Sequence, residues 1–173
     1  MKRTITWKRV LFLGLSFLVL ILFDQWTKAL AVSSLKDQEP FIILKNFFQL
    51  RYLENRGAAF GMMQGKQLFF AVIAIAAFIA ILYVYFKLPW ETHFHPLRAS
   101  VLFIGAGAAG NLIDRMSLGY VVDFFYFELI DFPIFNVADI YVTCATILLA
   151  VLILFYYKEE ELECLFPPKK EKK

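Results

Sequence analysis

The chain has 173 residues, of which 60% are hydrophobic and 19% are charged, and its formal net charge is +3. Soluble domains are about 45 to 50% apolar and about 25% charged, so this composition excludes an ordinary water-soluble globule. The apolar residues form blocks long enough to cross a bilayer, which predicts a single domain embedded in lipid. The basic residues gather at the termini and form no stripe interleaved with aromatic residues, which argues against nucleic acid as a partner.

Four apolar runs lie at residues 10–32, 68–86, 97–113 and 137–157. Since about 20 apolar residues span a bilayer as a helix, they predict an all-α membrane protein with four transmembrane helices in one integral membrane domain, residues 1–173. The first run is longer than the about 7 to 15 apolar residues of a signal peptide and lacks a clear cleavage site. We therefore expect it to be a retained helix.

Lysine and arginine residues flank the runs unequally. They precede the first run, border the loop between the second and third, and follow the fourth: Lys2, Arg3, Lys8, Arg9, Lys87, Arg98, Lys158, Lys169, Lys170, Lys172 and Lys173. Because basic flanks stay on the cytoplasmic side, this pattern predicts cytoplasmic termini and places the 1–2 and 3–4 loops outside. We expect residues 158–173 to form a disordered cytoplasmic tail.

The first run carries two ionisable residues, Asp24 and Lys28, in its outer third. They are four residues apart and so lie on one face of a helix. Such residues in lipid indicate either a neutralised ion pair or a functional site, and both alternatives stay open. If the pair is self-contained, Asp24→Asn should be less stable than Asp24→Asn combined with Lys28→Met, because the single change leaves an ammonium without its partner.

The loop after the first run has the pattern of a β-strand. Apolar and polar residues alternate over residues 48–52, and Asn55-Arg56-Gly57 is typical of a turn. We predict a small β element on the outer membrane surface.

The third run ends in closely spaced small residues, Gly105-Ala106-Gly107-Ala108-Ala109-Gly110. The Gly-x-Gly-x-x-Gly within it is not a dinucleotide fingerprint, because that motif requires a preceding strand. In a membrane helix, small residues at this spacing allow close packing. Asn111, Asp114 and Arg115 follow on one face. A helix-terminal salt bridge is the preferred interpretation for Asp114, and a role in a site is preferred for Asn111 and Arg115.

Two more carboxylates lie at the same membrane boundary. Asp123 stands among bulky apolar residues, and Asp139 follows Asn136 by three residues at the start of the fourth run. Helix capping by Asn136 would explain Asp139 but not Asp123. Two neighbouring carboxylates can share one proton, so that the ionised member activates water while the protonated member binds a carbonyl oxygen. Such chemistry fits an aspartyl peptidase and needs no cofactor.

Other chemistries lack their motifs. Neither Gly-x-Ser-x-Gly nor His-Glu-x-x-His occurs, and His93 and His95, with Glu91 nearby, lack further ligands, so we expect no metal site. A small transporter in which the acids relay protons, and a non-catalytic assembly protein held by its glycine-rich helix, remain as alternatives.

Five motifs, in this order, resemble the bacterial lipoprotein signal peptidase (signal peptidase II) family: Asp24-Gln25-x-Thr27-Lys28, Asn55-x-Gly57-Ala58-Ala59-Phe60, Gly107-x-x-Gly110-Asn111-x-x-Asp114-Arg115, Val121-Val122-Asp123-Phe124 and Phe135-Asn136-Val137-Ala138-Asp139. The resemblance implies an extracytoplasmic β-cradle at about residues 38–64 and a helix-containing 3–4 loop. It also implies cleavage of prolipoproteins before a lipobox cysteine that carries a diacylglyceryl group. Ala106 departs from a double glycine often seen in the family, and the chain continues into a charged tail.

The resemblance further assigns roles to residues. Asp123 and Asp139 correspond to the catalytic pair, and the residues that line or support the site are Asp24, Lys28, Asn55, Gly57, Gly107, Asn111, Asp114, Arg115, Asn136 and Ala138. Implied partners are membrane lipid and a diacylglyceryl-prolipoprotein, acted on by a monomer. The implied location is the bacterial cytoplasmic (inner) membrane, with the active site near the extracytoplasmic face.

Overall fold

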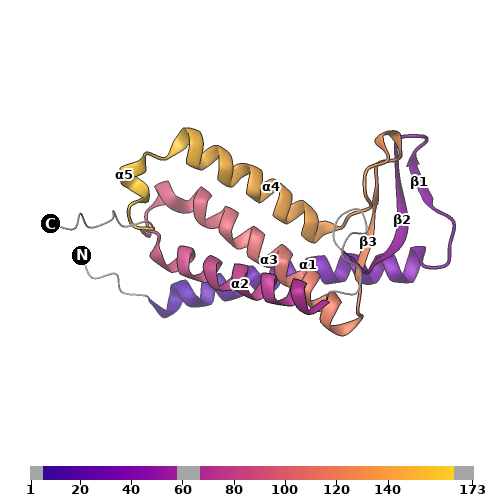
Figure 1. Ribbon diagram of the computed structural model, residues 1–173, viewed down its shortest axis with the longest axis horizontal. Coiled ribbons are helices and arrows are strands. Elements are labelled where there is room, and N and C mark those ends of the chain that lie inside the picture. The colour runs from indigo at the N-terminus through magenta and orange to yellow at the C-terminus, as the bar shows by residue number, and fades with distance from the viewer. Residues whose placement is uncertain (1–5, 58–66, 166–173) are drawn as a thin grey trace.

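The computed structural model describes residues 6–57 and 67–165. Within that part of the chain, four long helices run side by side and a three-stranded sheet covers one end of them (Figure 1). The helices are α1 (Trp7–Leu35), α2 (Gln67–Lys87), α3 (His95–Ser117) and α4 (Val137–Val151). Outside the described residues lie Ala58-Ala59-Phe60 of the second motif, the rest of the predicted cradle to residue 64, and residues 166–173 of the predicted tail.

The helices have the length and surface of membrane-spanning segments. Among the described residues, Trp7–Leu35, Thr92–Ser117 and Val137–Tyr156 are long and apolar enough to cross a bilayer, and Val72–Lys87 is a shorter apolar stretch. Large apolar side chains stay exposed along them, including Val19 at 63% and Phe155 at 82%. Lipid can cover such side chains, whereas water would disfavour them. The predicted class, a mainly helical membrane protein with a small sheet, is confirmed.

α1 reaches beyond the apolar layer. Its 29 residues correspond to about 43 Å, against about 30 Å for the hydrocarbon core of a bilayer. The far end of α1 therefore contacts the sheet, where it packs on both β2 (Phe48–Asn55) and β3 (Val121–Tyr126).

α3 is the central helix, since it contacts α1, α2 and α4. Its glycines make this possible because they let side chains and backbone of the neighbouring helices approach closely. A Cβ atom on Gly105 would lie 3.1 Å from the Phe17 ring of α1, one on Gly107 would overlap the Ala138 carbonyl oxygen of α4, and one on Gly110 would overlap the Asp24 carboxylate. The glycine run thus serves close helix packing, as its spacing predicts.

The sheet joins two loops that are distant in sequence. Its strand order is β1-β2-β3, with β1 formed by Phe41–Leu44, and both pairings are antiparallel. β3 comes from the 3–4 loop and places Asp123 opposite Leu53 of β2. The sequence pattern predicted strands only in the 1–2 loop. The composition of Val121–Tyr126, β-branched and aromatic apart from Asp123, favours a strand once β2 is available as a partner.

A buried apolar cluster fixes β3 onto the helices. It consists of Ala31, Leu35, Val122, Phe124 and Val137, from α1, β3 and α4. Because successive side chains of a strand point to opposite faces, anchoring Val122 and Phe124 in this cluster turns the intervening residue, Asp123, to the other face.

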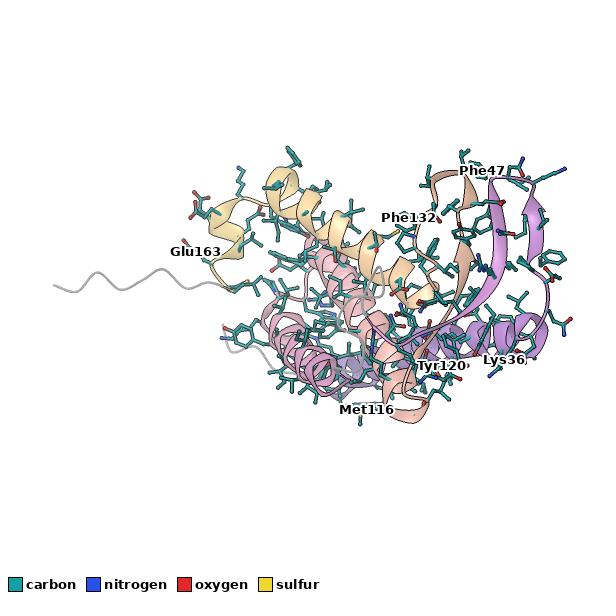
Figure 2. The ribbon with its side chains drawn as sticks, turned by 45° about the vertical axis from the view of Figure 1, so that its right-hand side comes forward. Lys36, Phe47, Met116, Tyr120, Phe132 and Glu163 are labelled. Carbon is teal, nitrogen blue, oxygen red and sulfur yellow. The ribbon has the colours of Figure 1, made fainter. Side chains whose placement is uncertain are left out.

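The opposite end of the helices has its own core, formed by Leu88, Phe94, Leu97, Leu152, Tyr157 and Leu165. α4 continues into it through a π-helical turn, Leu152–Tyr156, followed by α5 (Glu159–Leu162). The prediction of a disordered tail was therefore wrong for residues 158–165, because Leu162 and Leu165 have apolar surface to cover. Figure 2 shows Glu163 at this end and Lys36 and Phe47 at the sheet end.

Candidate active site

A cavity of about 850 Å³ lies between the sheet and the nearby ends of α3 and α4. Both aspartates of the predicted pair, Asp123 and Asp139, line it. Besides these two, its polar lining residues include Arg51, Glu54, Asn55, Arg56, Asn111, Arg115, Tyr126 and Asp131. The rest of the lining is mainly apolar and includes Phe132, Pro133, Ile134, Phe135, Ile140, Thr143 and Cys144. The space therefore suits a ligand with both a polar and an apolar part.

Asp139 is held by the start of α4. Asn136 is the N-cap residue: its Oδ1 accepts from the Asp139 backbone N–H at 3.0 Å, and its own backbone N–H donates to Asp139 Oδ2 at 3.1 Å. The capping role predicted for Asn136 is present as a reciprocal capping box. The other carboxylate oxygen of Asp139 accepts a hydrogen bond from Asn111 Nδ2 at 2.8 Å.

Asp123 is fully enclosed, with 1% of its surface exposed. Its Oδ1 accepts from Asn136 Nδ2 at 2.7 Å, and its Oδ2 accepts from Asn55 Nδ2 at 2.9 Å. Asn136 therefore binds both aspartates, one through its side chain and the other through its backbone. This shared residue brings the two carboxylates together on the cavity wall.

Burial raises the pKa of Asp123 to about 7, and the nearby charge of Asp139 acts in the same direction. The hydrogen bonds from Asn55 and Asn136 lower it and partly offset these effects. A carboxyl group with this pKa can keep its proton near neutral pH, which an acid catalyst requires.

Lys28 lies at the centre of a buried cluster of charges behind the cavity. Its Nζ is 2.9 Å from Asp24 Oδ2 and 2.9 Å from Asp114 Oδ2, and it donates to Asn111 Oδ1 at 2.9 Å. Asp24 and Lys28 are therefore not a self-contained pair. When Asp24, Lys28 and Asp114 are all ionised, the cluster has a net charge of −1. The Asp24→Asn prediction assumed that Lys28 has no other carboxylate partner, and this assumption is wrong.

Asp114 connects α3 to two other elements. Besides Lys28 of α1, it accepts from Gln25 Nε2 at 2.8 Å and from the Val122 backbone N–H at 3.2 Å. Asp24 has a similar role, since its Oδ1 accepts from the Ala138 backbone N–H at 3.0 Å. The preferred interpretation of Asp114, a terminal salt bridge of α3, missed these long-range contacts.

Asn55 and Arg115 line the cavity at the end of β2, next to Gly57. The predicted turn is present, because the Gly57 N–H donates to Asn55 Oδ1 at 3.0 Å. The Gly57 carbonyl accepts from Arg115 Nη2 at 3.3 Å, and Arg115 Nη1 donates to the Asn111 carbonyl at 3.3 Å. The turn thereby fixes the Asn55 amide that binds Asp123.

Gly107 allows α4 to approach α3. An added Cβ would overlap the Ala138 carbonyl and lie 2.8 Å from Val142 Cγ2. We expect Gly107→Ala to push α4 away from Asn111. This should lower the melting temperature, and it should lower the cleavage rate by about tenfold or more. Gly14→Ala is the matched control, because a Cβ there meets nothing within 4 Å. Thermal unfolding and cleavage rates test this, and equal behaviour of the two variants would contradict it.

No group of three or more His, Cys, Asp or Glu side chains that could hold a metal ion is found within residues 6–57 and 67–165. His93 is at the end of the helices remote from the cavity, where its Nε2 lies 2.9 Å from Glu161.

Sequence reasoning missed some residues around the site. Gln25 lay within a quoted motif but was given no role, although it donates to Asp114 and, at 3.3 Å, to the Gly110 carbonyl. A polar amide in an apolar run was the available signal. Tyr126 and Asp131, which form a 2.7 Å hydrogen bond beside the cavity, carried no such signal.

The fold and the cavity together define a helical membrane protein with an amide-bound pair of carboxylates at one end. The chain belongs to the signal peptidase II family, because the family model described as "Signal peptidase (SPase) II" matches residues 16–155. It is therefore a protease, and the resemblance predicted from the five motifs is confirmed.

Individual relatives agree with this assignment. The lipoprotein signal peptidase of Caldanaerobacter subterraneus is 46% identical over 136 residues, which are 78% of this chain and 90% of that protein. The lipoprotein signal peptidase of Clostridium tetani is 43% identical over 146 residues, 83% and 90% of the respective chains. A solved bacterial membrane enzyme, determined by the in meso method at 2.3 Å resolution, has 31% identity and a TM-score of 0.73, covering 93% of this chain and 94% of its own.

Proposed function

We propose that this protease removes signal peptides from diacylglyceryl-modified prolipoproteins by aspartyl catalysis, with Asp123 and Asp139 as the catalytic pair. Removal of signal peptides from prolipoproteins follows from the family. The aspartyl mechanism is supported by the position of both carboxylates on one cavity. Asn136 holds them there, because its Nδ2 donates to Asp123 at 2.7 Å and its Oδ1 accepts from the Asp139 backbone N–H at 3.0 Å.

The paired carboxylates can hydrolyse a peptide bond without a cofactor. One carboxylate takes a proton from water as the water oxygen attacks the scissile carbonyl carbon, and the protonated carboxyl stabilises the carbonyl oxygen. The pair then returns a proton to the leaving amine. Asn55, Asn111 and Asn136 have the supporting role of holding both carboxylates through hydrogen bonds at 2.9, 2.8 and 2.7 Å.

The mixed lining of the cavity supports a lipid-modified peptide as substrate. Backbone amides and carbonyls of a peptide suit the polar lining residues, and apolar lining residues such as Phe132 and Ile140 suit the acyl chains of a diacylglyceryl group. Because both aspartates and the asparagines that hold them come from one chain, we propose that a monomer is sufficient for catalysis.

A cleavage assay tests this proposal. Two peptides with the same lipobox, one with a diacylglyceryl cysteine and one with an unmodified cysteine, are incubated with the purified protein in lipid. We expect cleavage before the cysteine of the modified peptide and at least tenfold slower cleavage of the other. Equal cleavage of both peptides, or cleavage elsewhere, would contradict the proposed specificity.

We further propose that α1, α2, α3 and α4 all span the bacterial cytoplasmic membrane, with both termini cytoplasmic and the sheet and cavity at the extracytoplasmic face. Basic residues support this orientation, because Arg9, Lys87, Arg98 and Lys158 lie near the helix ends remote from the sheet. Such residues favour the cytoplasmic side.

Cysteine labelling in intact cells tests the orientation. After replacement of the native Cys144 and Cys164 by alanine, we expect a membrane-impermeant thiol reagent to label Lys45→Cys, in the turn between β1 and β2, from outside. Glu159→Cys in α5 is the control and should be labelled only after the membrane is opened. The reverse pattern would overturn the proposed topology.

A further inference from the structure

The two aspartates differ in what surrounds them. Asp139 is half-buried in the first turn of α4, where backbone N–H groups and the helix dipole favour a negative charge. Asp123 is enclosed on a strand, where it accepts hydrogen bonds from the neutral side-chain amides of Asn55 and Asn136. Burial disfavours the charged form of a carboxyl group. The surroundings therefore separate the pair into a member that is ionised more easily and one that holds a proton more easily.

A short chain of hydrogen bonds also connects Asp139 to a buried cation, Lys28. Lys28 Nζ donates to Asn111 Oδ1 at 2.9 Å, and Asn111 Nδ2 donates to Asp139 Oδ1 at 2.8 Å. Lys28 is 3% exposed, so solvent screens its charge weakly. A hydrogen bond accepted from an ammonium polarises the amide and strengthens the bond that the amide donates. Lys28 thus favours negative charge on Asp139 without touching it.

We infer that Lys28 is a positioning residue that acts through Asn111 to keep Asp139 as the ionised member of the pair, while Asp123 carries the proton. This inference rests on the proposed aspartyl mechanism and assigns its two roles. Asp139 removes a proton from water as the water oxygen bonds to the carbonyl carbon, and Asp123 gives its proton to the carbonyl oxygen. When the C–N bond breaks, Asp139 gives its proton to the amine and Asp123 recovers one from the resulting hydroxyl.

Several other charges face Asp139 and contribute to its ionisation. Asp123 faces it from β3, and Arg115 faces it from α3. From α1, Asp24 acts against the charge and Lys28 favours it. Asp114 of α3 acts through Lys28, to which it is paired at 2.9 Å. Removing Lys28 and removing the charge of Asp114 therefore change the local field in opposite directions.

The test is the dependence of kcat/KM on pH, measured with the diacylglyceryl peptide. For Lys28→Met we expect the acid limb, which reports ionisation of the base, to move to higher pH by about one unit, because a favourable cation is lost. For Asp114→Asn we expect the same limb to move to lower pH, because an unfavourable anion is lost. Lys28→Arg keeps the charge and should keep the limb of the wild type.

A purely structural role for Lys28 would lower activity without these opposite shifts. Limbs that coincide with the wild type in both Lys28→Met and Asp114→Asn would overturn the inference. If too little folded Lys28→Met protein is recovered, Asp114→Asn decides alone. The proposed mechanism fails separately, if Asp123→Asn or Asp139→Asn keeps its activity.

Discussion

Asparagine in place of either Asp123 or Asp139 should abolish cleavage of the diacylglyceryl peptide, lowering kcat by about 10³-fold or more while the protein stays folded. An asparagine keeps the shape of the side chain and one acceptor oxygen, so the cavity survives. It can neither take a proton from water nor hold the shared proton. Since we propose that the two residues act as one unit, we expect the double variant to be about as inactive as either single variant.

The structure supplies a control for this experiment. Asp131 lines the same cavity but is exposed and bound to the Tyr126 hydroxyl at 2.7 Å, so Asp131→Asn should keep activity within a few-fold. Cleavage rates and thermal unfolding in detergent are the measurements. Asp139→Asn should lose about 1 kcal/mol of stability, because half of its capping box is lost. Near-normal turnover of Asp139→Asn would leave capping as its only role and would refute the aspartyl mechanism.

Lys28→Met should destabilise the protein by about 3 to 5 kcal/mol, more than Asp24→Asn does. The change leaves the carboxylates of Asp24 and Asp114 buried without the ammonium that lies 2.9 Å from each. After Asp24→Asn, by contrast, Lys28 and Asp114 remain as a neutral pair. The double variant Asp24→Asn/Lys28→Met should therefore be less stable than Asp24→Asn alone, the reverse of what the sequence suggested.

Thermal unfolding of the four proteins in detergent measures this order. Lys36→Met is the matched control at the end of α1, because Lys36 is 41% exposed and its pair with Glu54, at 3.2 Å, is on the surface. Its cost should be within about 1 kcal/mol. A double variant more stable than Asp24→Asn would show that Asp114 does not share Lys28.

The sequence predicted the structural features that depend only on residues close together in the chain. The apolar runs gave the helices, the spacing of Asn136 and Asp139 gave the capping box, and the alternation over residues 48–52 gave part of β2. Each of these rests on periodicity or on contacts within one turn.

Features that join distant segments were not predictable in this way. β3 needs β2 as its partner, and Leu53 and Asp123 are far apart in the chain. Lys28 is four residues from Asp24, which made that pairing visible, whereas its contact with Asp114 arises only when α1 packs on α3. The order of residues 158–165 depends similarly on the apolar cluster that receives Leu165.

Asn136 both binds Asp123 and caps α4, which restricts the substitutions that could make this protein resistant to an inhibitor. An inhibitor that bound both carboxylates would depend on groups that Asn136 holds in place with its side chain, while the same side chain starts α4. A replacement at Asn136 that weakened the inhibitor would also disturb the beginning of the helix and the alignment of Asp123. Resistance by this route would therefore also weaken the catalysis that we propose for the pair.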